Sequence, residues 1–419
     1  MYAYLSESQR KAIDIIKQGE NVLITGPAGT GKSYLLQYIK NEFSYKKLHI
    51  TATTGIAAVN VSGTTLHSWA CLGIETLPLN EIVKNILSVK GINTRKKIQQ
   101  AEMLAIDEIS MLSSTTFELL DNLLKIVKGN EYPFGGIQLI LFGDFFQLPP
   151  VKNPDFCFES QAWKDAEIRV VELKESFRQQ DAEFLKLLNN IRWGERKKED
   201  IALLKERFFA KCESKIINPT ILTTHNAYAE KMNIEFLTRI TNREKIFEAE
   251  YSGKREKIEF LKKNCIAPEV LYLKIGAQVM MLKNTYAKDG VINGSIGIVV
   301  GFSLKKGYPI VEFQNGAEIV ISPETWEIEK FDNIAGQLVV EAEMTQIPLR
   351  LAWAMTIHKS QGMTLDCAEC DLKDVFTEGQ VYVALSRVKN LEGLYIKSFD
   401  INNIKASQKV IDFYTNNAE

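Results

Sequence analysis

The sequence lacks a strong excess of either charge, a long apolar run and a dense set of cysteines. Its 51 Lys and Arg residues nearly balance its 52 Asp and Glu residues, so the formal net charge is −1. Because no overall positive field attracts nucleic acid, binding of that kind must come from local basic patches. No apolar run approaches bilayer-spanning length, and the N-terminus has no signal-peptide pattern. We therefore expect an intracellular protein that does not contact membranes.

The six cysteines are scattered along the chain, which is typical of a reducing compartment and argues against a disulfide framework. Cys367 and Cys370 form the only CxxC pair, and without a second pair nearby they do not predict a zinc site. An apolar fraction of 45% and a charged fraction of 25% describe an ordinary globular protein. Because 419 residues are too many for one core, we expect two to four domains.

The most informative pattern begins at residue 21. Asn21 to Thr25 is a short apolar run that predicts a buried parallel strand, and residues 34–40 predict a helix. Between them, residues 26–33 read Gly-Pro-Ala-Gly-Thr-Gly-Lys-Ser and fit G-x-x-x-x-G-K-[ST]. A glycine loop between a strand and a helix predicts a phosphate-binding loop, since glycines let successive N–H groups turn toward phosphate oxygens. In such a loop Lys32 would reach the β- and γ-phosphates of a nucleotide, and the Ser33 hydroxyl would bind Mg²⁺.

Two further predicted strands end in polar residues that suit phosphate chemistry. Residues 101–106 lead into Asp107 and Glu108, and a third strand within residues 135–151 leads to Gln147. The carboxyl ends of parallel strands form the ligand-binding edge of an open α/β sheet. There Asp107 would hold Mg²⁺ through water, Glu108 would orient and deprotonate the attacking water, and Gln147 would sense the γ-phosphate. The alternative for the two acids is an ordinary acidic loop.

Residues 53–54 and 63–69 supply Thr hydroxyls, backbone N–H groups and one His, which suit contacts to a phosphodiester backbone. Helix capping explains Thr53 and Thr54 as well, and taken alone it is the preferred interpretation. Residues 70–100 resemble a small insertion. Its basic stretch, residues 94–97, is either a DNA contact or a solvated face.

The second half of the chain begins with an α/β pattern, continues with short alternating strands, and then returns to the α/β pattern. A strand at 216–222 and a helix after Asn226 begin a second α/β unit. Asn-Gly turns at 293 and 315 separate short strands that predict a small antiparallel barrel. The barrel strands are expected at 277–282, 295–302, 310–313, 318–321 and 338–345, and the returning α/β elements are expected at 351–356, 368–372 and 380–387.

Taken in order, these motifs resemble those of the superfamily 1 helicases, and within them the Pif-type 5′-to-3′ DNA helicases, with RecD-like and Dda-like enzymes as close relatives. Three segments are together highly specific: Gly-Gly-Ile-Gln-Leu-Ile-Leu-Phe-Gly-Asp-Phe-Phe-Gln-Leu-Pro-Pro from residue 135, Ile-His-Lys-Ser-Gln-Gly-Met-Thr-Leu from residue 357, and Val-Tyr-Val-Ala-Leu-Ser-Arg from residue 381. Residues 117–133 resemble the family's signature region. The chain holds little beyond the helicase core, so we expect no extra N-terminal regulatory domain.

The resemblance implies an α/β fold of two RecA-like P-loop domains with parallel sheets. The first would carry a small strand-separating wedge, and the second would carry an SH3-like β-barrel on the DNA side. The expected bounds are residues 1–69 and 101–187 for the first domain, 70–100 for the wedge, 188–246 and 349–419 for the second domain, and 247–348 for the barrel.

The resemblance also implies that one ATP lies between the two domains. Arg387 from the second domain, with Arg178 near the cleft, would stabilise charge on the γ-phosphoryl oxygens. The alternatives are a solvated helical arginine for Arg387 and a buried structural histidine for His358. For Gln9, a capping box with Ser6 and a hydrogen bond to the adenine edge are equally open and compatible.

The expected cofactors are ATP and Mg²⁺. The expected catalytic residues are Lys32, Glu108, Gln147, Arg178 and Arg387; the nucleotide-binding residues are Gln9, Gly26, Pro27, Ala28, Gly29, Thr30, Gly31, Lys32, Ser33 and Gly362; the magnesium ligands are Ser33 and Asp107; and the DNA-binding residues, mostly toward phosphates, are Thr54, Thr64, His67, Thr356, His358 and Lys359.

The implied activity is ATP-dependent translocation on single-stranded DNA and unwinding of duplex DNA, with G-quadruplexes and RNA–DNA hybrids as further substrates. The expected partners are single-stranded DNA and DNA forks, the expected state is a monomer, and the expected roles are DNA repair, recombination or telomere maintenance. Three alternatives stay open: a DNA-stimulated translocase with weak unwinding, a nucleotide-gated single-strand-binding module, and a ring-forming P-loop ATPase with one ATPase core per chain.

Overall fold

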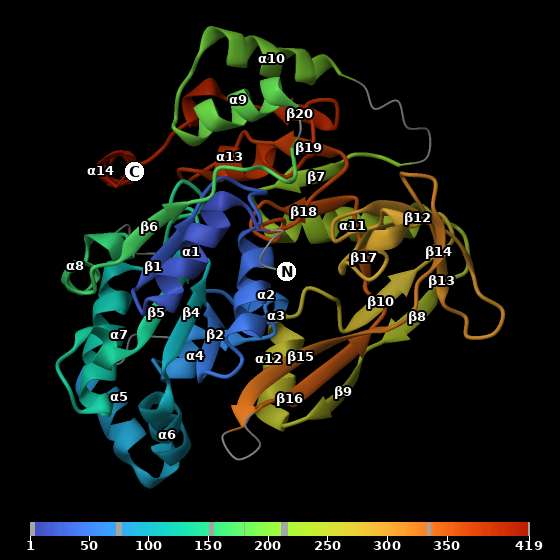
Figure 1. Cartoon of the computed structure of the whole chain (residues 1–419). Coiled ribbons are helices and arrows are strands. Elements are labelled where there is room, and N and C mark those ends of the chain that lie inside the picture. The colour runs from blue at the N-terminus through green and yellow to red at the C-terminus, as the bar shows by residue number, and fades with distance from the viewer. Residues whose placement is uncertain are drawn as a thin grey trace. The chain divides into compact units, whose positions relative to one another are not determined.

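The computed structural model describes residues 5–72, 78–150, 155–179, 181–210, 217–332 and 337–417 (Figure 1). Contacts group the chain into two compact units, which are described one at a time. The first unit is Met1–Phe177, Glu327–Ala342 and Gln408–Glu419, and the second is Arg178–Trp326 and Glu343–Ser407. Among the described residues, none of the helices combines the length and the apolar content that crossing a bilayer requires.

The first unit is built on a six-stranded sheet in the order β3-β2-β4-β5-β1-β6, and every neighbouring pair is parallel. Strands β1 and β5 consist of residues that are all buried, as expected for a parallel sheet with helices on its faces. The carboxyl ends of all six strands therefore lie at one edge. The strands are β1 (Val22–Thr25), β2 (Leu48–Ala52), β3 (Thr64–Thr65), β4 (Met103–Asp107), β5 (Gln138–Phe142) and β6 (Arg169–Glu172).

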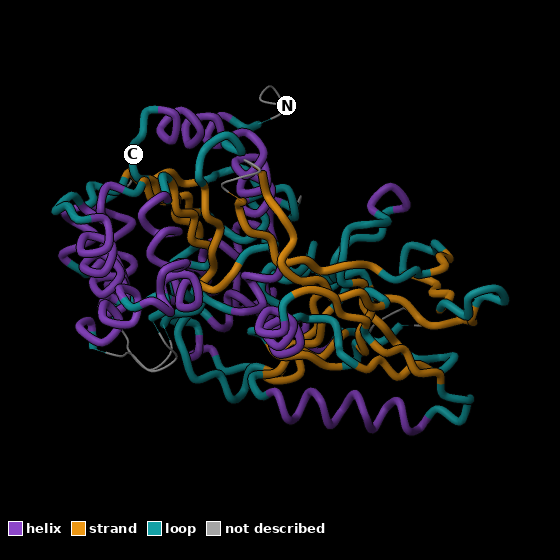
Figure 2. Tube along the Cα trace, turned by 90° about the horizontal axis from the view of Figure 1, so that it is seen from below, coloured by secondary structure: helices purple, strands orange, loops and turns teal. Residues whose placement is uncertain are grey.

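Helices lie on both sides of this sheet (Figure 2). Apolar side chains of α1 and α2 pack with Val22, Ile24 and Phe142 in one buried cluster, which fixes the helix that follows the glycine loop against the sheet. The helices are α1 (Glu7–Lys17), α2 (Lys32–Glu42), α3 (Gly55–Asn60), α4 (Leu66–Ala70), α5 (Leu79–Leu87), α6 (Ile92–Gln100), α7 (Ser114–Lys128), α8 (Gln161–Asp165) and α14 (Gln408–Asn416).

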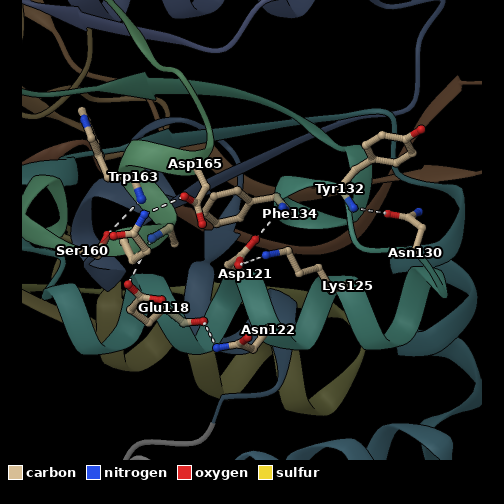
Figure 3. Close-up of polar contacts among 12 residues, drawn as sticks. Glu118, Asp121, Asn122, Lys125, Asn130, Tyr132, Phe134, Ser160, Trp163 and Asp165 are labelled. Atoms are coloured by element: carbon tan, nitrogen blue, oxygen red, sulfur yellow. Dashed lines mark hydrogen bonds and ion pairs between the residues drawn. The ribbon is translucent and has the colours of Figure 1, made fainter.

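Two carboxylates of α7 connect it to a neighbouring 3₁₀ turn and to α8 (Figure 3). The buried Asp121 accepts the Phe134 N–H at 2.6 Å and pairs with Lys125 at 2.6 Å, while Glu118 accepts the Ala162 N–H at 3.0 Å. The hydrogen bond from Phe134 accompanies a short 3₁₀ turn over Pro133–Gly136 with left-handed backbone at Phe134. The third strand, predicted within residues 135–151, begins after this turn at Gln138.

The C-terminal helix α14 belongs to the first unit. Phe413 contacts Phe145 and Phe158 with ring centroids 5.3 and 4.4 Å apart, and Tyr414 stacks on Phe146 at 4.9 Å. Burial of such large rings is a strong apolar driving force. The sequence prediction assigns residues 408–419 to the second domain, whereas these contacts group residues 408–417 with the first unit.

The second unit contains a four-stranded sheet in the order β18-β7-β19-β20, again with parallel neighbours only. Its strands are β7 (Thr220–Thr223), β18 (Ala354–Thr356), β19 (Ala368–Asp371) and β20 (Leu394–Ser398), and its helices are α9 (Ala182–Arg192), α10 (Lys198–Phe209), α11 (Asn226–Arg239), α12 (Arg255–Asn264) and α13 (Gln380–Leu385). Helix α13 ends at Leu385, so the prediction that it includes Arg387 is two residues too long.

The antiparallel insertion that the sequence predicts forms a five-stranded sheet in the order β14-β13-β12-β11-β17. Val279, Val299 and Val311 lie in its buried cluster, and Leu237 of α11 packs against it. The strands are β11 (Gln278–Met281), β12 (Ile296–Phe302), β13 (Pro309–Phe313), β14 (Glu318–Val320) and β17 (Leu349–Leu351).

Five further strands form two smaller sheets, β10-β8 and β15-β16-β9. The sequence prediction missed β8, β9, β10 and β15; β8 and β15 are rich in charged residues, whereas β10 is a short apolar run of four residues. They are β8 (Lys245–Glu248), β9 (Glu250–Gly253), β10 (Val270–Leu273), β15 (Glu324–Asp332) and β16 (Gln337–Gln346).

Candidate functional site: a phosphate-binding loop and its partner residues

The glycine loop connects β1 to α2, as the motif requires. Gly31 occupies the N-cap position of α2 with φ 82°, and Gly26 has φ 139°. A Cβ at Gly26 would lie 2.5 Å from the Leu173 carbonyl oxygen, closer than a side chain can approach. Glycine is therefore required at Gly26 by both conformation and space. The loop leads directly into a helix N-terminus, an arrangement that binds anions.

Lys32 lies over the loop rather than extending away from it. Its ammonium donates to the Gly26 carbonyl at 2.6 Å and to the Pro27 carbonyl at 3.0 Å, and the Thr30 hydroxyl donates to Pro27 at 2.9 Å. Ser33 follows in the first turn of α2 and is exposed. The loop is thus held in shape by its own side chains, with the lysine charge at the concave face where phosphates would lie.

Gln9 forms the capping box and also lies next to the phosphate loop. Its Oε1 accepts the Ser6 N–H at 3.1 Å and its N–H is capped by the Ser6 hydroxyl at 3.3 Å, so the capping box is present. Its Nε2 faces the phosphate loop, because a Cβ at Gly31 would lie 2.9 Å away from it. The ring of Phe177 would lie 3.4 Å from the same Cβ and is 60% exposed. The sequence analysis did not single out Phe177.

Asp107 and Glu108 lie at the end of β4, two strands from β1 in the sheet. The Asp107 carboxylate accepts the Glu108 N–H at 2.9 Å. Burial raises the pKa of Asp107 to about 6, against the opposing effects of that hydrogen bond and of the charge on Lys32. Glu108 has left-handed backbone with φ 55°, a strained conformation for a non-glycine residue. Asp107 is thus a buried acid near the charge of Lys32, and the neighbouring Glu108 has a strained backbone.

Thr53 ties the end of β2 to the acidic pair. Its N–H donates to the Asp107 carbonyl at 3.1 Å and its hydroxyl donates to the Glu108 carbonyl at 2.8 Å. Thr54 caps α3 by accepting the Ala57 N–H at 3.2 Å, which agrees with the capping interpretation. The two threonines therefore hold the loop, whatever else they contact.

Asp144 and Gln147 follow β5, which is the strand between β4 and β1 in the sheet. Both side chains are buried. A residue that the sequence analysis did not single out, Tyr414 of α14, lies among them. Its hydroxyl contacts the Thr25 hydroxyl at 2.6 Å and the Asp144 carboxylate at 3.4 Å, and it accepts the Phe145 N–H at 3.1 Å. Tyr414 therefore joins the end of β1 to the start of the loop that carries Gln147.

Arg387 and Arg178 lie together in the second unit. Arg387 is buried and donates to the carbonyls of Val383 at 2.8 Å and Ser360 at 3.3 Å, which contradicts the alternative of a solvated helical arginine. Arg178 donates to the Ser386 carbonyl at 3.1 Å. Burial and the positive charge of Arg387 lower the pKa of Arg178 to about 9. Two guanidinium groups held this close form a strong positive site for an anion.

The expected DNA-binding residues occupy strand ends in both units. In the first unit, Thr64 lies in β3, and burial lowers the pKa of His67 in α4. In the second unit Thr356 ends β18 and its hydroxyl accepts the Lys359 N–H at 3.3 Å. Lys359 pairs with Glu230 at 3.5 Å, and burial together with the charge of Arg350 lowers its pKa.

His358 and Gly362 complete this loop of the second unit. His358 is half-buried, and burial lowers its pKa. Gly362 has φ 77°, a left-handed conformation that favours glycine, and a Cβ there would meet open space. The position therefore calls for glycine because of backbone conformation rather than crowding.

The basic stretch of the insertion is largely engaged with its own fold. The Lys97 ammonium lies 5.3 Å from the Trp69 ring centroid and donates to the Trp69 carbonyl. Arg95 donates to the Leu87 carbonyl at 3.4 Å, while Lys96 is exposed. Residues 73–77 of the insertion lie outside the described part of the chain. Two of its basic side chains thus brace α6 against its neighbours.

Magnesium fits this donor set. Among the described residues, no group of three or more His, Cys, Asp and Glu side chains could hold a metal alone. Mg²⁺ usually takes only one or two protein oxygens and completes its shell with water and substrate phosphates. The Ser33 hydroxyl and the Asp107 carboxylate are hard oxygen donors of that kind.

The chain matches two family profiles and many individual proteins. The profile of PIF1-like helicases matches residues 4–201, and that of the 2B domain of the DNA helicase Pif1 matches residues 256–302. Human ATP-dependent DNA helicase PIF1 is 39% identical over 98% of this chain and 63% of its own length. ATP-dependent DNA helicase Pif1 of Psychrobacter is 37% identical over 92% of this chain and 67% of its own length. This chain thus spans less than two thirds of the human protein.

Solved structures agree over nearly the whole chain. Bacteroides Pif1 in complex with ADP-AlF₄ is 33% identical, covers 99% of this chain with 98% of its own, and superposes with a TM-score of 0.87. Bacteroides Pif1 bound to single-stranded DNA is 33% identical, covers 98% of this chain with 96% of its own, and gives a TM-score of 0.65. These relatives therefore share the fold described above, with its two parallel sheets, phosphate-binding loop and antiparallel insertion. The chain belongs to the PIF1-like helicase family.

Proposed function

We propose that this protein is an ATP-dependent DNA helicase that moves 5′-to-3′ on single-stranded DNA and separates duplex DNA. The observation that carries the proposal is the common edge of the first unit's sheet. There Lys32 follows β1, Asp107 and Glu108 end β4, and Gln147 follows β5. Family membership supports the same activity, since the named relatives are ATP-dependent DNA helicases.

In the proposed mechanism the loop N–H groups and Lys32 bind the β- and γ-phosphates of ATP, and Gln9 with Phe177 borders the base. Ser33 and Asp107 would hold Mg²⁺, and the ion would neutralise charge that develops on the phosphates. Glu108 takes the proton of the attacking water, and Gln147 contacts the γ-phosphate. The proton goes to the Glu108 carboxylate as water oxygen bonds to phosphorus and the bond to the ADP oxygen breaks.

Arg387 and Arg178 complete the proposal from the second unit. Arginines placed on the transferring phosphoryl group can contribute several powers of ten in rate. Their positive charges would make the second unit respond to the presence of a γ-phosphate. We propose that this response alternates the grip of two RecA-like domains on the strand, with residues 70–100 as wedge and the antiparallel insertion as the SH3-like domain.

The proposed DNA contacts are Thr54, Thr64, His67, Thr356, His358 and Lys359. Relatives have been solved bound to single-stranded DNA and at forked duplex DNA, which supports these as the substrates. The fork structure concerns two coordinating Pif1 helicases, so the proposed monomer needs measurement of mass on forked DNA. Roles in repair, recombination and telomere maintenance belong to the same proposal.

Duplexes with a 5′ tail or a 3′ tail test the proposal, with strand separation and ATP turnover measured together. We expect unwinding of the 5′-tailed duplex only, and Glu108→Gln should abolish turnover while nucleotide still binds. Glu42→Gln, an exposed acid on α2 of the same unit, is the matched control and should unwind normally. Turnover without unwinding of either duplex would favour a translocase, and unchanged turnover in Glu108→Gln would favour a nucleotide-gated binding module.

A further inference from the structure

Three aromatic rings form a stack at the carboxyl edge of the second unit's sheet. The Phe376 ring is nearly parallel to two imidazoles, with its centroid 6.5 Å from that of His225 at an interplanar angle of 19° and 6.4 Å from that of His358 at 14°. Nearly parallel rings at these distances belong to the range in which aromatic side chains associate. The three residues come from separate segments, so the fold brings them together.

Their positions follow from the strand order. His225 follows β7, His358 follows β18 and Phe376 follows β19, and β18, β7 and β19 are adjacent and parallel. Loops after adjacent parallel strands meet at one edge, the usual place for ligands in such sheets. The loop that carries Thr356 and Lys359 leaves the same edge.

Phe376 is unusual because its large apolar ring is exposed to solvent rather than buried. Its ring is 65% exposed, His225 is exposed as well, and His358 is half-buried. Single exposed apolar residues are common, but an exposed Phe beside two nearly parallel imidazoles adds to a flat aromatic surface. The backbone beneath it is held, because the Phe376 N–H donates at 3.2 Å to the side chain of the fully buried Gln380.

The chemistry of the stack is suited to bases rather than phosphates. Burial lowers the pKa of His358, so its ring is uncharged near neutral pH and adds aromatic surface rather than a positive charge. Flat aromatic surfaces bind the faces of unpaired bases with little sequence preference. The positive charge for the backbone comes from Lys359 in the neighbouring loop.

We propose that His225, Phe376 and His358 form a base-stacking platform for single-stranded nucleic acid on the second unit. This inference rests on the proposed function and deepens it, because it adds a base contact to a site expected to touch phosphates. It also reassigns His358 from a phosphate contact to a stacking partner. The occupant is the face of an unpaired base, so the platform discriminates between a strand with bases and one without them.

Binding to fluorescein-labelled oligothymidine, measured by anisotropy at several salt concentrations, tests the platform. Stacking one base on an aromatic ring changes affinity by roughly 5- to 100-fold, so Phe376→Ala should weaken binding by that factor. The slope of log affinity against log salt should stay unchanged, because that slope counts phosphate contacts. By contrast, Lys359→Ala should flatten the slope by about 0.7 for single-stranded DNA.

The decisive comparison uses an oligonucleotide of the same length in which abasic sites replace the thymidines. We expect the wild-type protein and Phe376→Ala to bind the abasic strand equally, and Phe376→Trp to restore binding to oligothymidine. Ile234→Ala is the matched control, since Ile234 is 63% exposed on α11 of the same unit, and it should bind both strands like the wild type.

Equal losses on both strands, or no loss on either, would overturn the platform. In those outcomes the wild-type protein still binds and unwinds, so the proposed function survives. A wild-type protein without affinity for single strands at low salt would overturn both proposals. Phe376→Leu keeps an apolar side chain and removes the ring, and it should reproduce the defect of Phe376→Ala if stacking rather than folding is affected.

Discussion

Replacing Asp107 with Asn should stabilise the nucleotide-free protein at neutral pH while it impairs the site. Burial raises the pKa of Asp107 from 3.8 to about 6, so ionising this carboxyl costs more in the folded protein than in the unfolded chain. The difference corresponds to about 3 kcal/mol of unfolding free energy at pH 7, at 1.36 kcal/mol per pH unit. Asn has no charge to desolvate, and its oxygen can still accept the Glu108 N–H.

The sign of the pH dependence follows from the raised value. Well below the unfolded pKa of 3.8 the carboxyl is protonated in both states and costs nothing; the penalty grows as pH rises from about 4 toward the folded pKa of about 6 and then levels off. The gap in apparent melting temperature between Asp107→Asn and wild type should therefore be near zero at pH 4 and widen by pH 7. Magnesium and nucleotide should close or reverse the gap, because the ion favours the carboxylate.

Differential scanning fluorimetry at several pH values, with a chelator and then with magnesium and ADP, measures this gap. Because a chain of two units need not unfold in one step, differences between variants at the same pH are compared rather than absolute free energies. Asp14→Asn, an exposed acid on α1, is the control and should give no widening. A gap of equal size at pH 4 and pH 7, or a destabilised Asp107→Asn at pH 7, would refute the reasoning.

Two further substitutions test the support of the phosphate loop. Gly26→Ala should lower the unfolding free energy by about 2–4 kcal/mol and abolish nucleotide binding, because the new Cβ would meet the Leu173 carbonyl. Gly19 also has a positive φ but lies in open space, so Gly19→Ala should lower the unfolding free energy by only about 1–2 kcal/mol. Calorimetric unfolding and binding of fluorescent ADP measure both effects, and equal costs would contradict the steric argument. Tyr414→Phe removes one hydroxyl with buried partners and should cost about 1–3 kcal/mol in unfolding free energy. Tyr45→Phe, at a ring that is 74% exposed, should be neutral in the same melt, and a neutral Tyr414→Phe would show that the hydroxyl is not needed.

The parts of the site that the sequence predicts share a local cause. The glycine loop, the acids after β4 and the Gln after β5 each follow a buried strand, and parallel strands bring their carboxyl ends together. The capping box of Ser6 and Gln9 is equally local, since both partners lie within one helical turn. Local sequence patterns and the geometry of parallel sheets are together enough to predict which residues gather at such a site.

The parts that sequence reasoning missed depend on contacts between distant segments. Tyr414 reaches Thr25 across 389 positions, and no periodicity marks the pair. The contact between Phe376 and His225 is of the same kind. Charged strands such as β8 and β15 escaped notice because they lack the alternation that identifies a half-buried strand.

The placement of Tyr414 changes how the first unit should be understood. Its hydroxyl contacts Thr25, the last residue before the glycine loop, and Asp144, which accepts the Gln147 N–H through its carbonyl at 2.9 Å. One side chain near the end of the chain thus fixes the spacing of the two segments proposed to contact the β- and γ-phosphates. Since preorganised geometry rather than covalent chemistry dominates phosphoryl transfer, such spacing matters for rate. In the proposed nucleotide site, the packing of α14 on the first unit therefore fixes the end of β1 against the segment that carries Gln147, although α14 lies far from both in the sequence.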